Sequence, residues 1–189
     1  MRVITGTARG TNLKAPAGLA TRPTGDKVKQ ALFNMIQYEI AGDVLDLFAG
    51  SGQLGIEALS RGAKSAVFVD QGRDAIAVIR ENVKKCHMEE KSQIVCCDYL
   101  SYLCKCKKSF RLIFLDPPYG EKYLENAIKC ISEIDILAEG GIIVAERPLG
   151  KDLDGTYPGL EPSKDYTYGK TVIRLYRKKD SSRQENDQS

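Results

Sequence analysis

Long apolar runs are absent from this chain of 189 residues. None approaches the roughly 18 to 20 residues that a helix needs to cross a bilayer, so a helical membrane protein is excluded. The first residues also lack a charged segment followed by an apolar one, which is the order found in secretory signals. We therefore expect a cytoplasmic protein that makes no contact with a membrane.

Paired cysteine motifs are missing too, although the chain contains six cysteines. No two of them have the CxxC spacing, and His87 is the only histidine. Because a structural zinc site usually needs two such pairs, we expect no bound metal. Disulfide frameworks belong to small secreted chains, so the cysteines are expected to be free thiols in a reducing compartment.

Acidic residues are scarce at the N-terminal end, where Asp26 is the only one among residues 1–30. The basic residues of the same segment are Arg2, Arg9, Lys14, Arg22, Lys27 and Lys29. Such a local excess of positive charge can attract a phosphate backbone, but it is equally typical of a solvated, mobile basic arm. Gly, Thr, Arg and Pro dominate residues 1–25, which are predicted to form an extended arm or a small hairpin.

Beyond Asp26, short apolar segments alternate with stretches of helical spacing. Strands are predicted at residues 44–48, 66–69, 93–97, 112–115 and 142–145. Apolar strands separated by helices indicate a parallel sheet that is covered on both faces. Residues 171–177 alternate apolar and polar side chains after a segment rich in Pro and Gly, which favours an antiparallel hairpin at the sheet edge. We therefore expect an α/β fold with a mostly parallel, seven-stranded sheet.

A single domain suits a chain of this length. It is expected to cover residues 26–178, after the arm at 1–25. The polar residues 179–189 are predicted to be a disordered tail.

Four of the predicted strands end in a carboxylate, at Asp46, Asp70, Asp98 and Asp116. In parallel sheets, ligands bind beyond the carboxyl ends of the strands, near the point where the strand order reverses. Asp is also common after strands because it suits turns and helix starts. One or two such residues would be unremarkable, whereas four favour a binding site.

A glycine-rich turn follows the first predicted strand, with the sequence Gly-Ser-Gly-Gln-Leu-Gly at residues 50–55. Glycines here let the backbone approach a ligand, and Asp70, 18 residues beyond Gly52, is placed to hold ribose hydroxyls. This pattern alone does not separate a dinucleotide from S-adenosylmethionine. Asp46, four residues before Gly50, would repel a pyrophosphate but suits the cationic amine of S-adenosylmethionine.

The sequence Asp-Pro-Pro-Tyr at residues 116–119 follows the fourth predicted strand. An exocyclic base amine is a poor nucleophile, since its lone pair is delocalised into the ring. The Asp116 carboxylate and the Pro117 carbonyl can each accept a hydrogen bond from one of its two N–H groups and so orient the amine. Tyr119 offers a flat face on which an unstacked base can lie. The alternative interpretation is a proline-rich turn with a half-buried tyrosine.

Together, the motifs at residues 46–52 and 116–119 resemble those of class I amino-methyltransferases. The segments 2–6, 22–34 and 168–171 narrow the resemblance to the RsmD family, and the likeness extends to about Arg177. That resemblance implies a Rossmann-like class I methyltransferase fold, with S-adenosylmethionine as cofactor and guanine N2 of 16S ribosomal RNA as target. Gly25 and Gln30 depart from the residues that are frequent in the family.

The resemblance also implies roles for individual residues. The cofactor-binding residues would be Asp46, Phe48, Gly50, Gly52, Asp70, Asp98 and Tyr99. Of these, Asp46 and the glycines would line the methionine end, Asp70 would bind the ribose, and Asp98 with Tyr99 would flank the adenine. The residues acting on the guanine would be Asp116, Pro117 and Tyr119. The residues contacting RNA, or a small-subunit assembly intermediate, would be Arg2, Arg9, Arg22, Thr24, Lys27 and Lys29.

Three other functions remain open at this point. The same chemistry could act on DNA adenine or on a protein amide. The glycine turn could serve a nicotinamide-dependent oxidoreductase, in which case residues 116–119 are a mere turn. The chain could also be a non-catalytic RNA-binding module. A monomer is expected, because nothing in the sequence indicates a large apolar patch.

Overall fold

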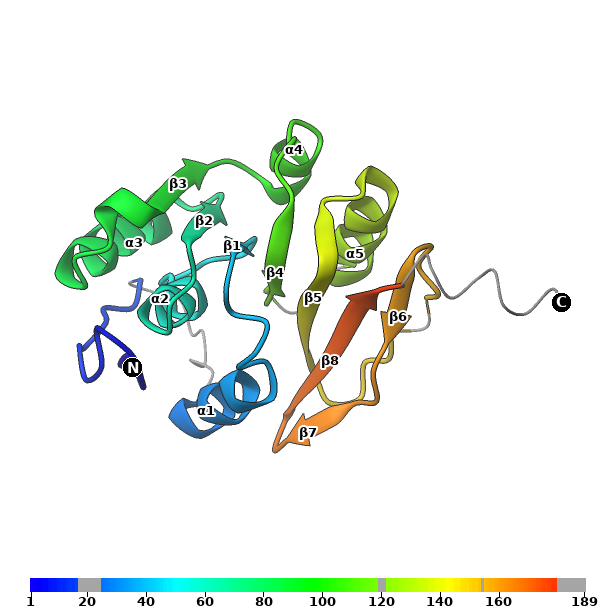
Figure 1. Ribbon diagram of the computed structural model, residues 1–189, viewed down its shortest axis with the longest axis horizontal. Helices are drawn as coiled ribbons and strands as arrows, with labels where there is room; N and C mark the ends of the chain where they lie inside the picture. Colours follow the sequence, from blue (N-terminus) through cyan, green and yellow to red (C-terminus); the bar gives the residue numbers. More distant parts are fainter. Residues whose placement is uncertain (17–24, 119–121, 154, 180–189) are drawn as a thin grey trace, which may run out of the picture.

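The alternation of strands and helices continues along most of the chain in a computed structural model, which describes residues 1–16, 25–118, 122–153 and 155–179 (Figure 1). In chain order the elements are α1 (Asp26–Met35), β1 (Asp43–Asp46), α2 (Gln53–Ser60), β2 (Ser65–Asp70), α3 (Arg73–Lys85), the 3-10 helix η1 (Glu89–Lys91), β3 (Ser92–Cys96), α4 (Tyr99–Leu103), β4 (Phe110–Leu115), α5 (Tyr123–Ile134), β5 (Leu137–Pro148), β6 (Leu160–Pro162), β7 (Tyr166–Tyr168) and β8 (Thr171–Lys178). None of the helices in these described ranges is long and apolar enough to cross a bilayer.

One mixed sheet joins all these strands in the order β3-β2-β1-β4-β5-β8-β6, with β7 also paired to β8. The pairs from β3 to β5 are parallel, and β8 is antiparallel to β5, β6 and β7. The expected α/β fold with a mostly parallel sheet is therefore confirmed. The order reverses between β1 and β4, because the chain runs outward through β2 and β3 before it returns. Because ligands of such sheets bind where the strand order reverses, we expect the binding site at the carboxyl ends of β1 and β4.

The sheet edge differs from the expected hairpin in one respect. The described strands number eight rather than seven, because β6 and β7 both pair with β8. β8 is long enough, at eight residues, to hold these two short strands one after the other along its outer side while β5 occupies its inner side.

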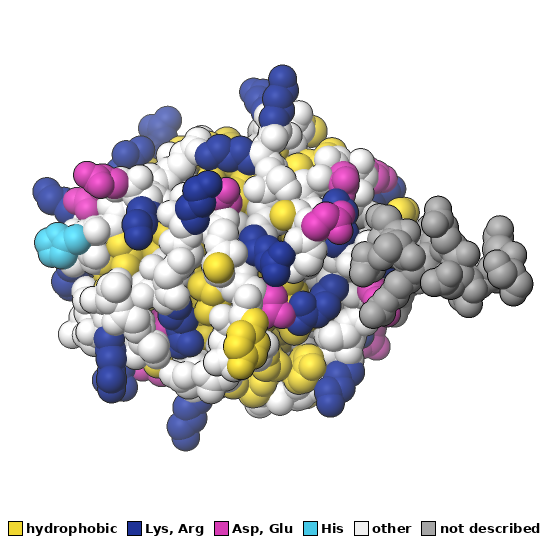
Figure 2. All heavy atoms as spheres, in the orientation of Figure 1, with side chains coloured by type: hydrophobic (Ala, Val, Ile, Leu, Met, Phe, Trp, Pro, Cys, Tyr) yellow, Lys and Arg dark blue, Asp and Glu magenta, His cyan; other side chains and the backbone are white. Residues whose placement is uncertain are grey.

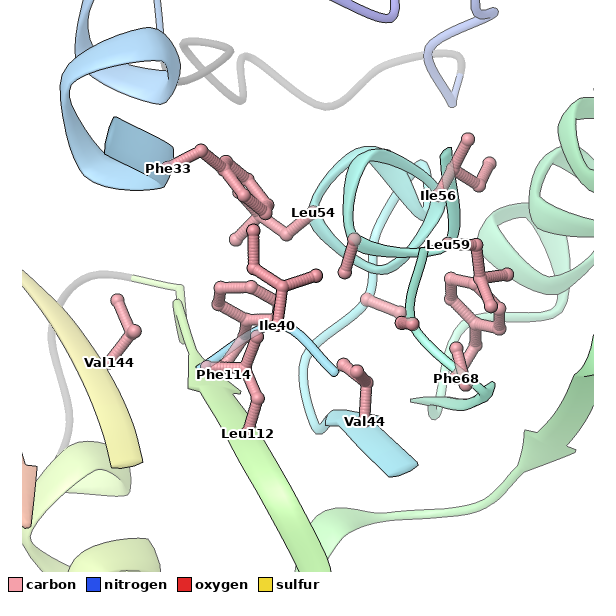
Figure 3. Packing of buried hydrophobic residues seen from close by; sticks show 14 of the residues in the cluster. Phe33, Ile40, Val44, Leu54, Ile56, Leu59, Phe68, Leu112, Phe114 and Val144 are labelled. Carbon is pink, nitrogen blue, oxygen red and sulfur yellow. The ribbon is translucent and has the colours of Figure 1, made fainter. Parts of the chain in front are cut away.

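Side chains on the two faces of the sheet form separate hydrophobic cores. Val44, Phe114 and Val144 pack with α1, α2 and α3 on one face, whereas Leu45 packs with α4 and α5 on the other. Figure 3 shows Phe33 of α1 pointing toward Phe114 of β4, and their ring centroids are 5.7 Å apart. Strands with apolar residues on both faces are those expected of a sheet that helices cover on both sides.

The N-terminal residues 1–16 form a small hairpin that packs against α2 and α3. Val3 donates a backbone hydrogen bond to Thr11, and Arg2 and Asn12 form a β-bridge. Asn82 of α3 bonds to both the backbone N–H and the carbonyl of Lys14. Of the two shapes expected for this segment, its described part is therefore a docked hairpin and not a solvated arm.

A buried ion cluster lies beneath this hairpin. Glu57 of α2 has no exposed surface, and its carboxylate accepts hydrogen bonds from the backbone N–H groups of Ile4 and Thr5. The Lys29 ammonium lies 3.4 Å from one Glu57 oxygen, and Arg61 Nε lies 2.8 Å from the other. Burial lowers the pKa of Lys29, and the charge of Glu57 opposes this shift. Glu57 thereby ties the hairpin, α1 and α2 to one another.

We predict that Glu57→Gln lowers the free energy of unfolding by about 3–5 kcal/mol, since it leaves the Lys29 ammonium buried beside a neutral amide. Urea unfolding followed by circular dichroism measures the change. The matched control is Glu90→Gln on the exposed helix η1, which is expected to stay within about 0.5 kcal/mol of the parent. Equal stability of the two variants would contradict the structural role of the cluster.

Candidate active site at the carboxyl ends of the strands

Asp46 ends β1 at the point where the strand order reverses. Its side chain is buried with only 2% exposed surface, and its Oδ2 accepts a hydrogen bond of 3.0 Å from the backbone N–H of Gly55. Burial, together with the nearby charge of Asp70, raises the pKa of Asp46 to about 7. A carboxylate in such a place is stabilised by a cationic ligand, which offsets the cost of keeping the charge away from water.

The glycine turn between β1 and α2 depends on backbone conformations that favour glycine. Gly50 and Gly52 have φ values of +55° and +77°, in the left-handed region. A Cβ atom at Gly50 would meet no heavy atom within 4 Å, so the backbone there is open to a ligand. At Gly55 a Cβ atom would lie 2.3 Å from the Phe68 ring, so this third glycine lets α2 pack closely on β2.

Asp70 ends β2 and holds the glycine turn from the other side. One of its oxygens accepts a hydrogen bond of 2.8 Å from the Gly50 N–H, and the other accepts one of 2.8 Å from the Gly72 N–H. The turn is thus fixed between two strand-end carboxylates, because Asp46 bonds to the first turn of α2 while Asp70 bonds to Gly50.

Aromatic side chains gather beside this turn. Phe48 lies 5.1 Å from Tyr99 between ring centroids, and Tyr123 of α5 completes the cluster at 5.7 Å from Tyr99. Asp98, just before Tyr99, is exposed and accepts a hydrogen bond from the Ser101 N–H, so it caps α4. Hydrogen bonds from Ser101 lower the pKa of Asp98.

Asp116 follows β4, the neighbour of β1 in the sheet. It is partly exposed, and Pro117 after it is buried. Burial raises the pKa of Asp116 well above the usual range of a carboxyl, and the charges of Glu146 and Asp46 raise it further. Asp116 therefore belongs to the same carboxylate group as Asp46. Tyr119 lies outside the described residues.

A small hollow, open to solvent, adjoins the start of the Asp-Pro-Pro-Tyr motif. Its lining includes Pro117, Pro118 and Leu124 together with Glu146 and Arg147 from the end of β5. The described part of the motif thus borders both a group of carboxylates and an accessible cavity.

Comparison with known proteins identifies the family. The family described as conserved hypothetical protein 95 matches residues 1–177. The YlbH protein of Bacillus subtilis is 45% identical over 183 residues, which is 95% of this chain and 100% of that protein. Ribosomal RNA small subunit methyltransferase D of Haemophilus influenzae is 34% identical, and the alignment covers 93% of each chain. The chain belongs to the RsmD family of methyltransferases.

Solved structures agree with this assignment of the chain to the RsmD family. The yhhF protein of Escherichia coli superposes with a TM-score of 0.85 at 29% sequence identity, covering 95% of this chain and 98% of that one. The fold expected from the RsmD resemblance, a Rossmann-like class I methyltransferase, is therefore confirmed.

The residues at the glycine turn fit the cofactor that the RsmD resemblance implies. Asp46 is a buried carboxylate suited to an ammonium group, and the backbone at Gly50 is open to a ligand. Gln53, also buried, has a side-chain oxygen with no hydrogen-bond partner among the described residues. Asp46, Gly50, Gly52 and Gln53 would hold the amino-acid end of S-adenosylmethionine, and Asp70 would take the ribose.

The residues expected to contact RNA fall into three groups: exposed residues, residues outside the described ranges, and the buried Lys29. Arg2, Arg9 and Lys27 are exposed, on the hairpin and at the start of α1. Figure 2 shows Lys and Arg side chains protruding around the part of the surface that carries these elements. Arg22 and Thr24 lie outside the described residues.

The expectation that Lys29 contacts RNA is wrong. Its side chain has no exposed surface, and its ammonium donates to the Arg2 carbonyl oxygen while it lies beside Glu57. A phosphate cannot reach this group without unfolding of the hairpin. Counting charges along the sequence missed this, because the count does not show that Glu57 lies opposite Lys29.

Three residues at the site were missed by the analysis of the sequence. Glu146 near the end of β5 is the clearest case, since it follows an apolar strand as the four aspartates do, and the same reasoning would have found it. Gln53 stands inside the glycine motif at a variable position. Tyr123 gave no signal, because its place beside Tyr99 depends on how α5 packs against α4.

We predict that Gly55→Ala destabilises the fold by about 1–3 kcal/mol, because the added methyl group overlaps the Phe68 ring. Thermal and urea unfolding measure the loss. Gly25→Ala is the matched control, since a Cβ atom there meets no heavy atom within 4 Å and its φ is −58°. A Gly55→Ala variant as stable as the control would contradict the close packing of α2 on β2.

Proposed function

We propose that this chain transfers a methyl group from S-adenosylmethionine to the exocyclic N2 of a guanine in small-subunit (16S) ribosomal RNA. The observation that carries the proposal is the position of Asp116 and Pro117 at the end of β4, next to Asp46 of β1 across the strand reversal. Here a cofactor held by the glycine turn and an amine held by the Asp-Pro-Pro-Tyr motif would meet. The names of the relatives, which include ribosomal RNA small subunit methyltransferase D, support the choice of substrate.

Binding of the cofactor falls to the residues of β1, β2 and the glycine turn. S-adenosylmethionine, when bound, supplies a methyl group activated by a sulfonium charge. Asp46 would bind its ammonium group, and the backbone at Gly50 would allow its close approach. Phe48 and Tyr99 offer apolar faces for the adenine, with Asp98 at the edge of that region.

Orientation of the amine falls to Asp116 and Pro117. A guanine amine carries two hydrogens, and the Asp116 carboxylate and the Pro117 carbonyl are two acceptors on adjacent residues. Holding both hydrogens fixes the nitrogen and favours its pyramidal form, which restores its lone pair for reaction. Asp116 therefore acts as an orienting acceptor. Tyr119 is proposed to stack on the base, which must leave its own stack to reach this site.

Recognition of RNA is proposed for the exposed basic surface of the hairpin and α1. Arg2, Arg9 and Lys27 would contact phosphates there, together with Arg22 and Thr24. Arg2 forms an exposed ion pair of 3.3 Å with Asp26, and such pairs are weak enough to exchange for a phosphate. Contacts of this kind position the RNA without reading its sequence.

A nicotinamide-dependent oxidoreductase is the weaker candidate on the same geometry. The dinucleotide's pyrophosphate would add negative charge beside Asp46, whose pKa is already raised by burial and by the charge of Asp70. DNA adenine and protein amides remain alternative amine substrates, and the test below distinguishes them from RNA by the macromolecule that carries the label.

We predict that Asp116→Asn lowers kcat for methyl transfer to undermethylated small ribosomal subunits by at least about 100-fold, because the amide no longer accepts the amine hydrogen as a carboxylate does. Transfer of tritiated methyl groups, sorted by ribonuclease and protease treatment, measures the effect. Asp74→Asn, an exposed position on α3, is the matched control and should keep parental activity. Full activity of Asp116→Asn would refute the role of Asp116.

We also predict that affinity for S-adenosylmethionine falls by about tenfold between pH 8 and pH 6. Asp46, with a pKa of about 7, takes up a proton in this range and no longer offers a negative charge to the ammonium group. Isothermal titration calorimetry across the pH range measures the dissociation constant.

The Asp46→Asn variant tests the origin of that pH dependence. It should bind the cofactor weakly at every pH, with a flat profile. Asp43→Asn, at the other end of β1 where Asp43 accepts a hydrogen bond from Ser65, should keep the parental profile. A pH profile unchanged by Asp46→Asn would show that another group binds the ammonium.

A further inference from the structure

Glu146 is a buried carboxylate that the mechanism above does not use. It lies near the end of β5 with 6% exposed surface. Its cross-strand partner on β8 is Ile173, which belongs to the hydrophobic core on the α1, α2 and α3 face of the sheet. Glu146 follows Val144 by two residues, and Val144 belongs to the same core. Its side chain therefore stands on the same face of the sheet as the core beneath α1 and α2.

The strand register places Glu146 next to Asp116. The last pair in the register of β4 and β5 joins Leu115 to Ala145, and the residues that follow these two are Asp116 and Glu146. The negative charge of Glu146 contributes to the raised pKa of Asp116, which is consistent with two carboxyl groups side by side. Glu146 and Pro117 also line the same hollow.

The hydrogen-bonding edge of guanine suggests a role for a carboxylate at the position of Glu146. Beside the N2 amine, the Watson–Crick edge of guanine carries the N1–H group, and both are hydrogen-bond donors. Adenine has the opposite arrangement, because its N1 is an acceptor next to the N6 amine. A carboxylate adjacent to the group that holds the amine would accept the guanine N1–H and would repel the adenine N1 lone pair.

We propose that Glu146 reads the N1–H of the target base and so selects guanine over bases whose N1 is an acceptor. This inference rests on the proposed function, since it takes the amine to be held by Asp116 and Pro117. The two carboxyl groups then have different roles. Asp116 with Pro117 orients the reacting N2 amine, and Glu146 accepts a hydrogen bond from the neighbouring N1–H. A carboxylate placed to accept the N1–H discriminates against a base with an unprotonated N1, because the lone pairs of the two acceptors repel each other.

The test uses 2,6-diaminopurine in place of the target guanine. This base keeps the N2 amine but has an unprotonated N1. The substrates are small ribosomal subunits reconstituted with 16S RNA that carries either base at the position mapped by mass spectrometry. Wild-type protein is expected to methylate the guanine substrate with a kcat/KM about 100-fold or more above that for 2,6-diaminopurine.

The Glu146→Gln variant should narrow this preference to about tenfold or less, because the amide can donate a hydrogen bond to the unprotonated N1. Glu161→Gln, an exposed position on β6, is the matched control and should keep the parental preference. Unfolding curves and affinity for S-adenosylmethionine show whether each variant is folded.

The possible outcomes separate this inference from the proposed function. An equal rate of wild-type protein on the two bases overturns the role of Glu146, even if the variant does not fold. A preference unchanged by Glu146→Gln in a folded variant overturns it as well. No transfer to the guanine substrate by wild-type protein would instead overturn the proposed function itself.

Discussion

A parallel sheet brings the ends of its strands to one edge, and in this chain that edge collects carboxylates. Asp70, Asp46, Asp116 and Glu146 lie at or near the carboxyl ends of β2, β1, β4 and β5, which are four consecutive strands of the sheet. Burial raises the pKa of Asp46 and of Asp116, and the charges of neighbouring carboxylates raise both further. A folded chain keeps such a row only where ligand groups or internal donors offset its charge.

The remaining architecture provides those donors and leaves room for the ligands. Asp46 and Asp70 are partly satisfied by backbone N–H groups of the glycine turn, which fixes the turn in an open, left-handed conformation. The buried Glu57 carboxylate differs from those at the strand ends, because the cationic side chains of Lys29 and Arg61 neutralise it. Glu57 also ties the N-terminal hairpin to α2. The buried cluster around Glu57 therefore joins the hairpin to the fold, while the strand-end row is proposed to receive a cation and a base.

Much of the fold and part of the site could be predicted from the sequence, because both depend on local patterns. The strand and helix periods gave the parallel sheet, and Asp46 with the glycine turn was recognisable from spacing alone. Contacts between distant segments were not predictable: Lys29 is buried because Glu57 lies opposite it, and Tyr123 meets Tyr99 because α5 packs on α4. The short strands β6 and β7 were not placed by the sequence, because their pairing with the two ends of β8 depends on contacts between separate segments.

The central claim is that the carboxylate row serves to present a guanine amine to a methyl donor. The most direct measurement is liquid chromatography with mass spectrometry of nucleosides from 16S RNA, after undermethylated small subunits are incubated with the protein and deuterated S-adenosylmethionine. The account predicts the deuterated methyl group in N2-methylguanosine and in no adenosine product. Label in N6-methyladenosine, or its absence from RNA while the cofactor is bound, would contradict it.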